Sequence, residues 1–163
     1  MDWKTNMAEL GGAFAVSLLV LGEDNMVMMG VLLAVVMAAM AGAHVLPMFT
    51  WISAMTGDLQ DTDAWIGNGM RLLFQVLGAA LALLLMAEAG DVTAADSEMW
   101  GVDVWGAEDY AMVGAVMMLA AGALIGAIAS RCDGWMTAFA VVALAGSLGA
   151  GVGGADMMAS DLV

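Results

Sequence analysis

The sequence predicts an all-α integral membrane protein with five transmembrane helices and re-entrant half-helices. First, 63% of its 163 residues are hydrophobic, against roughly 45–50% in soluble globular chains. Second, only 12% of the residues are charged, and they fall in short clusters between long apolar runs. Lipid excludes charged side chains from membrane spans, and this exclusion produces such a pattern. A water-soluble fold of this size could not bury so much apolar surface.

A helix needs about 20 mostly apolar residues to cross a bilayer. The predicted spans lie at about 7–22, 26–45, 67–87, 110–130 and 134–154. The first has the weakest support from hydropathy, because it is short and contains Glu9. The six tryptophans lie mainly near span ends, as in the aromatic belt of a membrane interface. We therefore expect a single transmembrane domain over residues 1–163, without a cleaved signal peptide.

The orientation follows from the basic residues, which are Lys4, Arg71 and Arg131. With five spans and a cytoplasmic N-terminus, all three lie on the cytoplasmic side, as the positive-inside rule requires. The sequence thus predicts a multi-pass protein of the cell membrane. Its net charge of −14 repels nucleic acid, so the lipid bilayer is the expected partner and no nucleic acid is expected.

The only proline, Pro47, precedes an apolar run at 48–56 that is too short to cross a bilayer. Proline suits the first turn of a helix, where its missing N–H costs nothing. The pattern predicts a re-entrant half-helix over about 47–56, and irregular backbone before it must be buried or line a cavity. The alternative is that the second span continues past Pro47 with a kink.

The C-terminal run AGSLGAGVGGADMMASDLV is rich in glycine, which destabilises a helix interior. We expect the chain to leave helical geometry there. A second half-helix over about 156–163 can restart at Asp156, a favourable N-cap residue. A frayed terminus is the alternative.

Four segments carry a resemblance to a known family: MAELGGAFAVSLLVL (7–21), GAHVLPMFT (42–50), FQVLGAALALLL (74–85) and GGADMMASDL (153–162). In this order they resemble the first span, the first signature, the third span and the second signature of the aquaporin and glycerol-facilitator family. The resemblance implies an aquaporin-like bundle that here lacks the sixth span. In that family two half-helices meet at mid-membrane, and an Asn at each end donates hydrogen bonds to passing water or polyol.

The resemblance also implies which residues line the pore: Gly42, Ala43, His44, Val45, Leu46, Pro47, Met48, Met157, Met158, Ala159 and Ser160. The two asparagine positions read Leu46 and Met157, and the position of the filter arginine reads Ser160. An apolar constriction of this kind tends to dewet. The sequence therefore predicts a channel protein with altered pore signatures, which passes small neutral solutes or does not conduct.

Two further residues match family positions inside the predicted spans. The family's glutamate at the position of Glu9 braces a loop by accepting backbone N–H groups, and Gln75 would bridge in a similar way. We expect both residues to be structural braces. A neutral, structural role is also favoured for His44 over a pH-sensing one.

Two other functions stay open. A chain without a sixth span exposes helix faces, which favours a homo-oligomer or partner membrane subunits, and hence a structural or assembly subunit of a larger complex. Met40, His44 and Met48 stand at i, i+4 and i+8, one face if the helix continued through Pro47. Such ligands suit Cu(I), although Met is also a common filler of apolar cores. With one His, one Cys and no Gly-rich phosphate loop, neither an enzyme nor a cofactor is expected.

Overall fold

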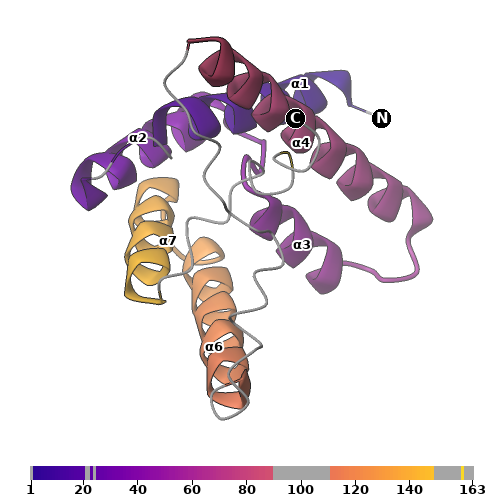
Figure 1. Cartoon of the computed structure of the whole chain (residues 1–163). Coiled ribbons are helices and arrows are strands. Elements are labelled where there is room, and N and C mark those ends of the chain that lie inside the picture. The colour runs from indigo at the N-terminus through magenta and orange to yellow at the C-terminus, as the bar shows by residue number, and fades with distance from the viewer. Residues whose placement is uncertain (1, 21–22, 24, 90–110, 149–158, 160–163) are drawn as a thin grey trace.

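The computed structural model describes residues 2–20, 23, 25–89, 111–148 and 159, and these are helical with no strand (Figure 1). The all-α class is therefore as predicted. The elements are α1 (Trp3–Ala15), the single-turn π-helix η1 (Val16–Val20), α2 (Met26–Ala39), α3 (Pro47–Thr56), α4 (Thr62–Ala89), α6 (Ala111–Ala129) and α7 (Gly134–Leu148).

Short polar side chains fix where three helices begin. Asp2 caps α1 by accepting hydrogen bonds from the Lys4 N–H at 3.0 Å and the Thr5 hydroxyl at 2.7 Å. The hydroxyl and then the N–H hold the pKa of Asp2 below its usual value. Asn25 caps α2 in the same way. Asp61 accepts from two N–H groups in the first turn of α4, so that helix begins at Thr62, earlier than the predicted start at residue 67.

The predicted span 26–45 is too long, because α2 ends at Ala39. Gly42 and Val45 have φ angles of +93° and +66°, which no α-helix accommodates. Leu46 precedes a proline and is extended, with φ −108° and ψ 137°. A new helix, α3, then begins at Pro47, and its bounds coincide with the short helix expected there.

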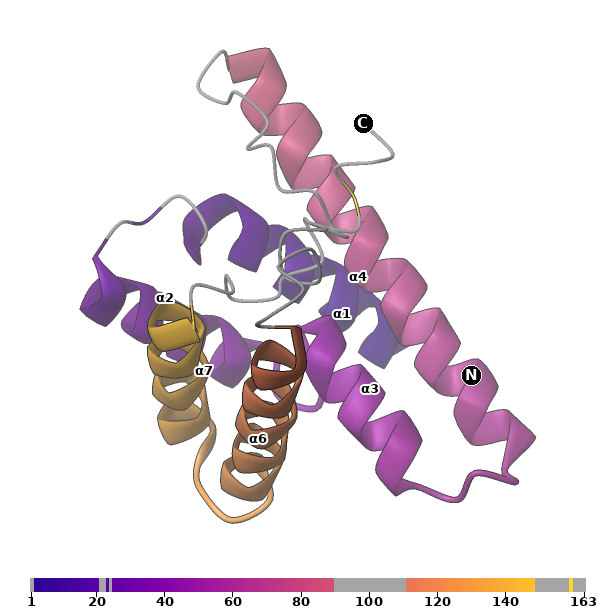
Figure 2. The same ribbon diagram turned by 60° about the horizontal axis from the view of Figure 1, so that its bottom comes forward.

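The helices form two groups that are joined through η1, which packs against both α2 and α4. In one group α1 packs along α4, and α3 packs against α4 as well; in the other, α2 packs along α7, and α6 packs against α7 (Figure 2). The larger apolar core joins the groups and includes Leu33, Leu46 and Val141. A smaller core lies between α1 and α4, where Ala159 packs with Ala13 and Ala79.

One helix in the described part of the chain is long and apolar enough to cross a membrane: α4, over the 25 residues Thr62–Met86. Only 28% of its most apolar window is buried within the protein. The helical stretches Met26–Ala39, Leu119–Ala129 and Gly134–Leu144 are apolar but shorter. α6 and the start of α7 agree with the spans predicted at 110–130 and 134–154. Residues 149–154, and all of the second half-helix except Ala159, lie outside the described residues.

Helices α1 and α4 approach each other very closely at Gly78 of α4. A Cβ atom there would lie 2.1 Å from the Leu10 carbonyl oxygen and 3.1 Å from the Phe14 nitrogen, both backbone atoms of α1. Backbone cannot rotate away as a side chain can. Glycine is therefore required for α1 and α4 to touch, as small residues are in helix pairs generally.

Gly78→Ala should force α1 and α4 apart and destabilise the protein by about 1–3 kcal/mol. The matched control is Gly69→Ala in the same helix, where a Cβ meets nothing within 4 Å. That substitution should be neutral or stabilising by about 0.5–1 kcal/mol, because alanine favours helix. Unfolding of both variants in detergent, followed by circular dichroism, measures the difference. Equal stability of the two variants would contradict this packing.

Candidate functional site

The site is the turn between α2 and α3, and the buried carboxylate of Glu9 holds it. Glu9 Oε1 accepts the N–H of His44 at 2.7 Å, and Oε2 accepts the N–H of Val45 at 2.8 Å. The Glu9 side chain comes from α1 and is 0% exposed. Two successive N–H groups that converge on one anion form a small anion-binding concavity. The turn is thus anchored to α1 rather than to its own helices.

The turn has an unusual backbone conformation at Val45. A β-branched residue at φ +66° is strained by on the order of 1–3 kcal/mol, so its surroundings must impose the conformation. The Glu9 carboxylate supplies one constraint. Gly12 supplies another, because a Cβ there would lie 2.9 Å from Val45 Cγ2. Glycine at this position lets α1 approach the turn closely enough for Glu9 to reach it.

Gln75 of α4 extends the site across the core. Its Nε2 donates to Glu9 Oε2 at 2.7 Å and to Thr50 Oγ1 at 3.0 Å. Thr50 Oγ1 in turn lies 3.1 Å from His44 Nδ1. Gln75 and Thr50 are each 0% exposed. Three helices, α1, α3 and α4, and the turn are therefore tied together by polar contacts in a largely apolar interior, where such contacts are strong.

The negative charge of Glu9 has one cationic neighbour. Arg71 Nη1 lies 3.5 Å from Glu9 Oε1, and the Arg71 side chain is 27% exposed. At that distance the guanidinium balances the charge more than it forms a tight hydrogen bond. A buried carboxylate needs this compensation, because an unpaired charge in an apolar interior is very costly. Arg71 and Thr50 belong to the site without a predicted role in it. Thr50 is the last residue of the GAHVLPMFT segment. Its place in that segment was the only sequence feature that could have assigned it to the site.

The start of α3 is apolar. Leu46 occupies the N-cap position, makes no side-chain capping bond and is 0% exposed. Helices usually place Ser, Thr, Asp or Asn there. Val45 is also fully buried, and Phe49 is 9% exposed. The N-cap and the first three residues of α3, Leu46 to Phe49, therefore offer no side-chain hydroxyl, amide or carboxyl group.

A cleft of about 370 Å³ lies beside the turn, between α3 and the α6–α7 corner. His44, Phe49 and Thr137 are among its lining residues, and Leu46 is not. The remaining predicted site residues are scattered. Gly42 is exposed, whereas Ala43 and Met48 are half-buried. Ala159 is buried against α1 and α4, and Met157, Met158 and Ser160 lie outside the described residues.

The copper alternative loses its geometric basis. Met40, His44 and Met48 do not share a helical face, because α2 ends at Ala39 and α3 begins at Pro47. The residues that the structure describes also contain no group of three or more His, Cys, Asp or Glu side chains able to hold a metal ion.

No protein-family model, no curated protein and no solved structure matches this chain. Function is therefore inferred from the contacts of its own residues.

Glu9→Gln should loosen the turn. The amide keeps one acceptor oxygen but turns an NH₂ group toward Gln75 Nε2 and the backbone donors, so at least one buried donor is left unpaired. The expected cost is about 1–3 kcal/mol. Hydrogen exchange at the His44 and Val45 amides should accelerate more than at other buried amides. Glu23→Gln, the same change near the surface, is the control. Unchanged exchange at both amides would show that the carboxylate does not hold the turn.

Proposed function

We propose that the chain is an aquaporin-like membrane channel protein with altered pore signatures, in which the water path is slow or closed at mid-membrane. One observation carries the proposal. A short helix begins at a turn braced by Glu9, in the manner of a re-entrant half-helix, yet its N-cap residue is the fully buried, apolar Leu46.

The outward faces of the helices support a membrane location. Leu73, Leu77 and Leu81 of α4 stand at i, i+4 and i+8 and are 44–51% exposed. Val27, Val31 and Val35 form the same stripe on α2 and are 41–67% exposed. Continuous apolar stripes of this kind are unfavourable in water and are satisfied by lipid. We accordingly propose a multi-pass protein with the predicted five spans.

The length of α3 supports re-entrance. Its 10 residues extend about 15 Å, half of the roughly 30 Å hydrocarbon core. The turn before it has free backbone groups that would be costly in lipid, and Glu9 satisfies two of them. The positive end of the α3 dipole then points to mid-membrane, as in the family that the sequence resembles.

The orientation has support from the α1–α4 pair. Asp2, at the start of α1, and Arg71 line one cleft, so Lys4 and Arg71 lie at the same end of the pair. That arrangement agrees with both basic residues facing the cytoplasm, and with a cytoplasmic N-terminus.

The expected consequence for transport is slow water passage. Water in a narrow neck loses bulk hydrogen bonds, and Leu46 offers no replacement. An unsatisfied polar group costs on the order of several kcal/mol, and each 1.4 kcal/mol or so is a decade in rate. Permeation would then be orders of magnitude below that of an open water channel. Small neutral or gaseous solutes tolerate such a neck better, because they lose fewer hydrogen bonds.

A structural or assembly subunit is the second candidate, and one observation favours it. An apolar groove of about 630 Å³ lies between α3 and α6, where Trp51 and Met55 are 49% and 63% exposed. A second copy or another membrane subunit could cover this groove. Size in detergent, with identification of co-purifying chains, tests that candidate independently of transport.

The double variant Leu46→Asn, Met157→Asn should raise water permeability by an order of magnitude or more, since it restores donors at both asparagine positions. Stopped-flow light scattering on proteoliposomes measures the rate. Leu46→Met is the control, because it changes the same side chain but leaves the neck apolar, and its rate should match that of the unmodified chain.

The proposal would be contradicted if the unmodified protein had the water permeability of a functional aquaporin. So would a double variant that is folded, by its circular dichroism and size in detergent, but no faster than Leu46→Met.

A further inference from the structure

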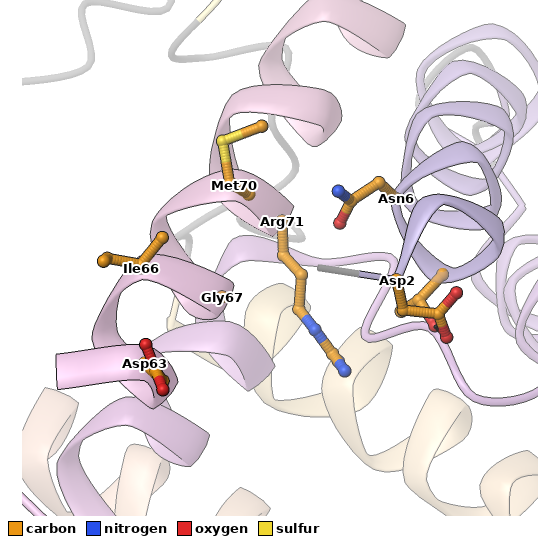
Figure 3. A pocket seen from close by; sticks show the side chains of 8 residues that line it. Asp2, Asn6, Asp63, Ile66, Gly67, Met70 and Arg71 are labelled. Atoms are coloured by element: carbon orange, nitrogen blue, oxygen red, sulfur yellow. Dashed lines mark hydrogen bonds between the residues drawn. The ribbon is translucent and has the colours of Figure 1, made fainter. Parts of the chain in front are cut away.

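A second cleft, of about 540 Å³, lies between the first turns of α1 and α4, away from the α2–α3 turn (Figure 3). Its lining includes Asp2, Asn6, Asp63, Ile66, Met70 and Arg71. None of these residues has a part in the predicted pore. Acidic, basic and apolar side chains all line this one cleft.

Asn6 is the residue that points to a ligand. It is 4% exposed, and its Nδ2 has no hydrogen-bond partner among the residues that the structure describes. Figure 3 shows its side chain extending from α1 toward α4, on the side of Arg71. A buried amide donor without a partner is costly in a folded protein. An acceptor atom of a bound molecule in the cleft would remove that cost.

Arg71 supplies the positive charge in the same cleft. Its one polar contact in the described part of the chain is the long approach of Nη1 to Glu9 at 3.5 Å. The other guanidinium N–H groups remain available, and the side chain is 27% exposed. A guanidinium fork together with an amide donor is a common arrangement for binding a phosphate. The donors thus favour an oxyanion.

A simple anion does not fit, because Asp2 and Asp63 line the same cleft. Both side chains are exposed at its mouth. Two carboxylates repel a free anion but attract an ammonium group. A ligand that carries a phosphate and an amine on one short chain would match both the donors and the carboxylates of the lining.

The level of the cleft in the membrane suggests the source of that group. Trp3 and Trp65 flank the cleft in the sequence, next to Asp2 and Ile66, and are 61% and 38% exposed. Exposed tryptophans mark the headgroup level of a bilayer. Ile66, which is 59% exposed, and Met70 add an apolar wall suited to a glycerol backbone.

We propose that this cleft binds a phosphate–amine zwitterion, supplied by the headgroup of a phospholipid such as phosphatidylethanolamine. Arg71 and Asn6 contact the phosphate, and Asp2 and Asp63 contact the ammonium. The choice of a lipid source rests on the membrane location in the proposed function, and not on any conduction of water.

The test titrates the full chain in detergent with three probes: dihexanoyl phosphatidylethanolamine, dihexanoyl phosphatidylglycerol and free O-phosphoethanolamine. Calorimetry should show the ethanolamine lipid binding at least tenfold more tightly than the glycerol lipid. Asn6→Leu should weaken binding of the ethanolamine lipid about tenfold or more, and Asp63→Asn should reduce the preference over the glycerol lipid. Asn68→Leu is the matched control, since Asn68 lies on α4 outside the cleft, and it should bind as the unmodified chain does.

Stability without ligand separates a binding role from a structural one. Leu has nearly the shape of Asn, so Asn6→Leu should keep or raise the thermal midpoint of the ligand-free protein by removing an unpaired donor. A lowered midpoint would assign Asn6 to the fold and overturn the proposal.

The remaining outcomes are also decisive. Free phosphoethanolamine that binds as tightly as the lipid keeps the cleft chemistry but overturns the lipid source. No binding of either ethanolamine probe, or equal binding of the two lipids, overturns the site itself. None of these readouts depends on water flow. A failed permeability test would therefore not affect the proposal that the cleft binds a lipid headgroup.

Discussion

The fold depends on one buried carboxylate. Glu9 accepts the N–H groups of His44 and Val45 and a hydrogen bond from Gln75, and so joins α1, the α2–α3 turn and α4. These contacts span up to 66 residues of sequence and lie in an interior that is otherwise apolar. The buried Glu9 carboxylate must be compensated by its hydrogen-bond donors. Removal of any one of these donors is therefore costly. The strained turn at Val45 and the separate start of α3 both follow from this constraint.

Because of the same constraint, the position of α3 does not depend on which residue occupies its N-cap. The brace fixes where α3 begins and how its N-terminal dipole is directed, whatever residue stands at the N-cap. Leu46 can therefore replace a hydrogen-bonding residue without loss of the turn, since it packs in the apolar core with Phe49. Under the proposed function, a channel architecture can in this way persist with an apolar neck. Arg71 links the brace to the cleft at the start of α4, because its side chain takes part in both.

Local signals in the sequence predicted the helices well where local chemistry decides them. Apolar runs located α6 and the start of α7, and Pro47 marked the start of α3. The end of α2 at Ala39 was not predictable in this way, because residues 40–45, apart from His44, remain small or apolar and continue the hydropathy of the span. There the outcome is set by Glu9, more than 30 residues earlier in the chain. Tertiary contacts likewise brought Thr50 and Arg71 into the site and left Asn6 Nδ2 without a hydrogen-bond partner among the described residues.

The depth of α3 in a bilayer tests the central claim, a re-entrant helix braced by Glu9, most directly. Spin labels at Trp51→Cys, Met55→Cys and Asp58→Cys, on a Cys132→Ser background, report depth through their relative accessibility to oxygen and to a water-soluble nickel complex. All three native side chains are exposed, so labels there should not disturb packing. We expect the deepest label at residue 51, a shallower one at 55 and an aqueous one at 58. Equal depth at all three, or an aqueous label at 51, would contradict it.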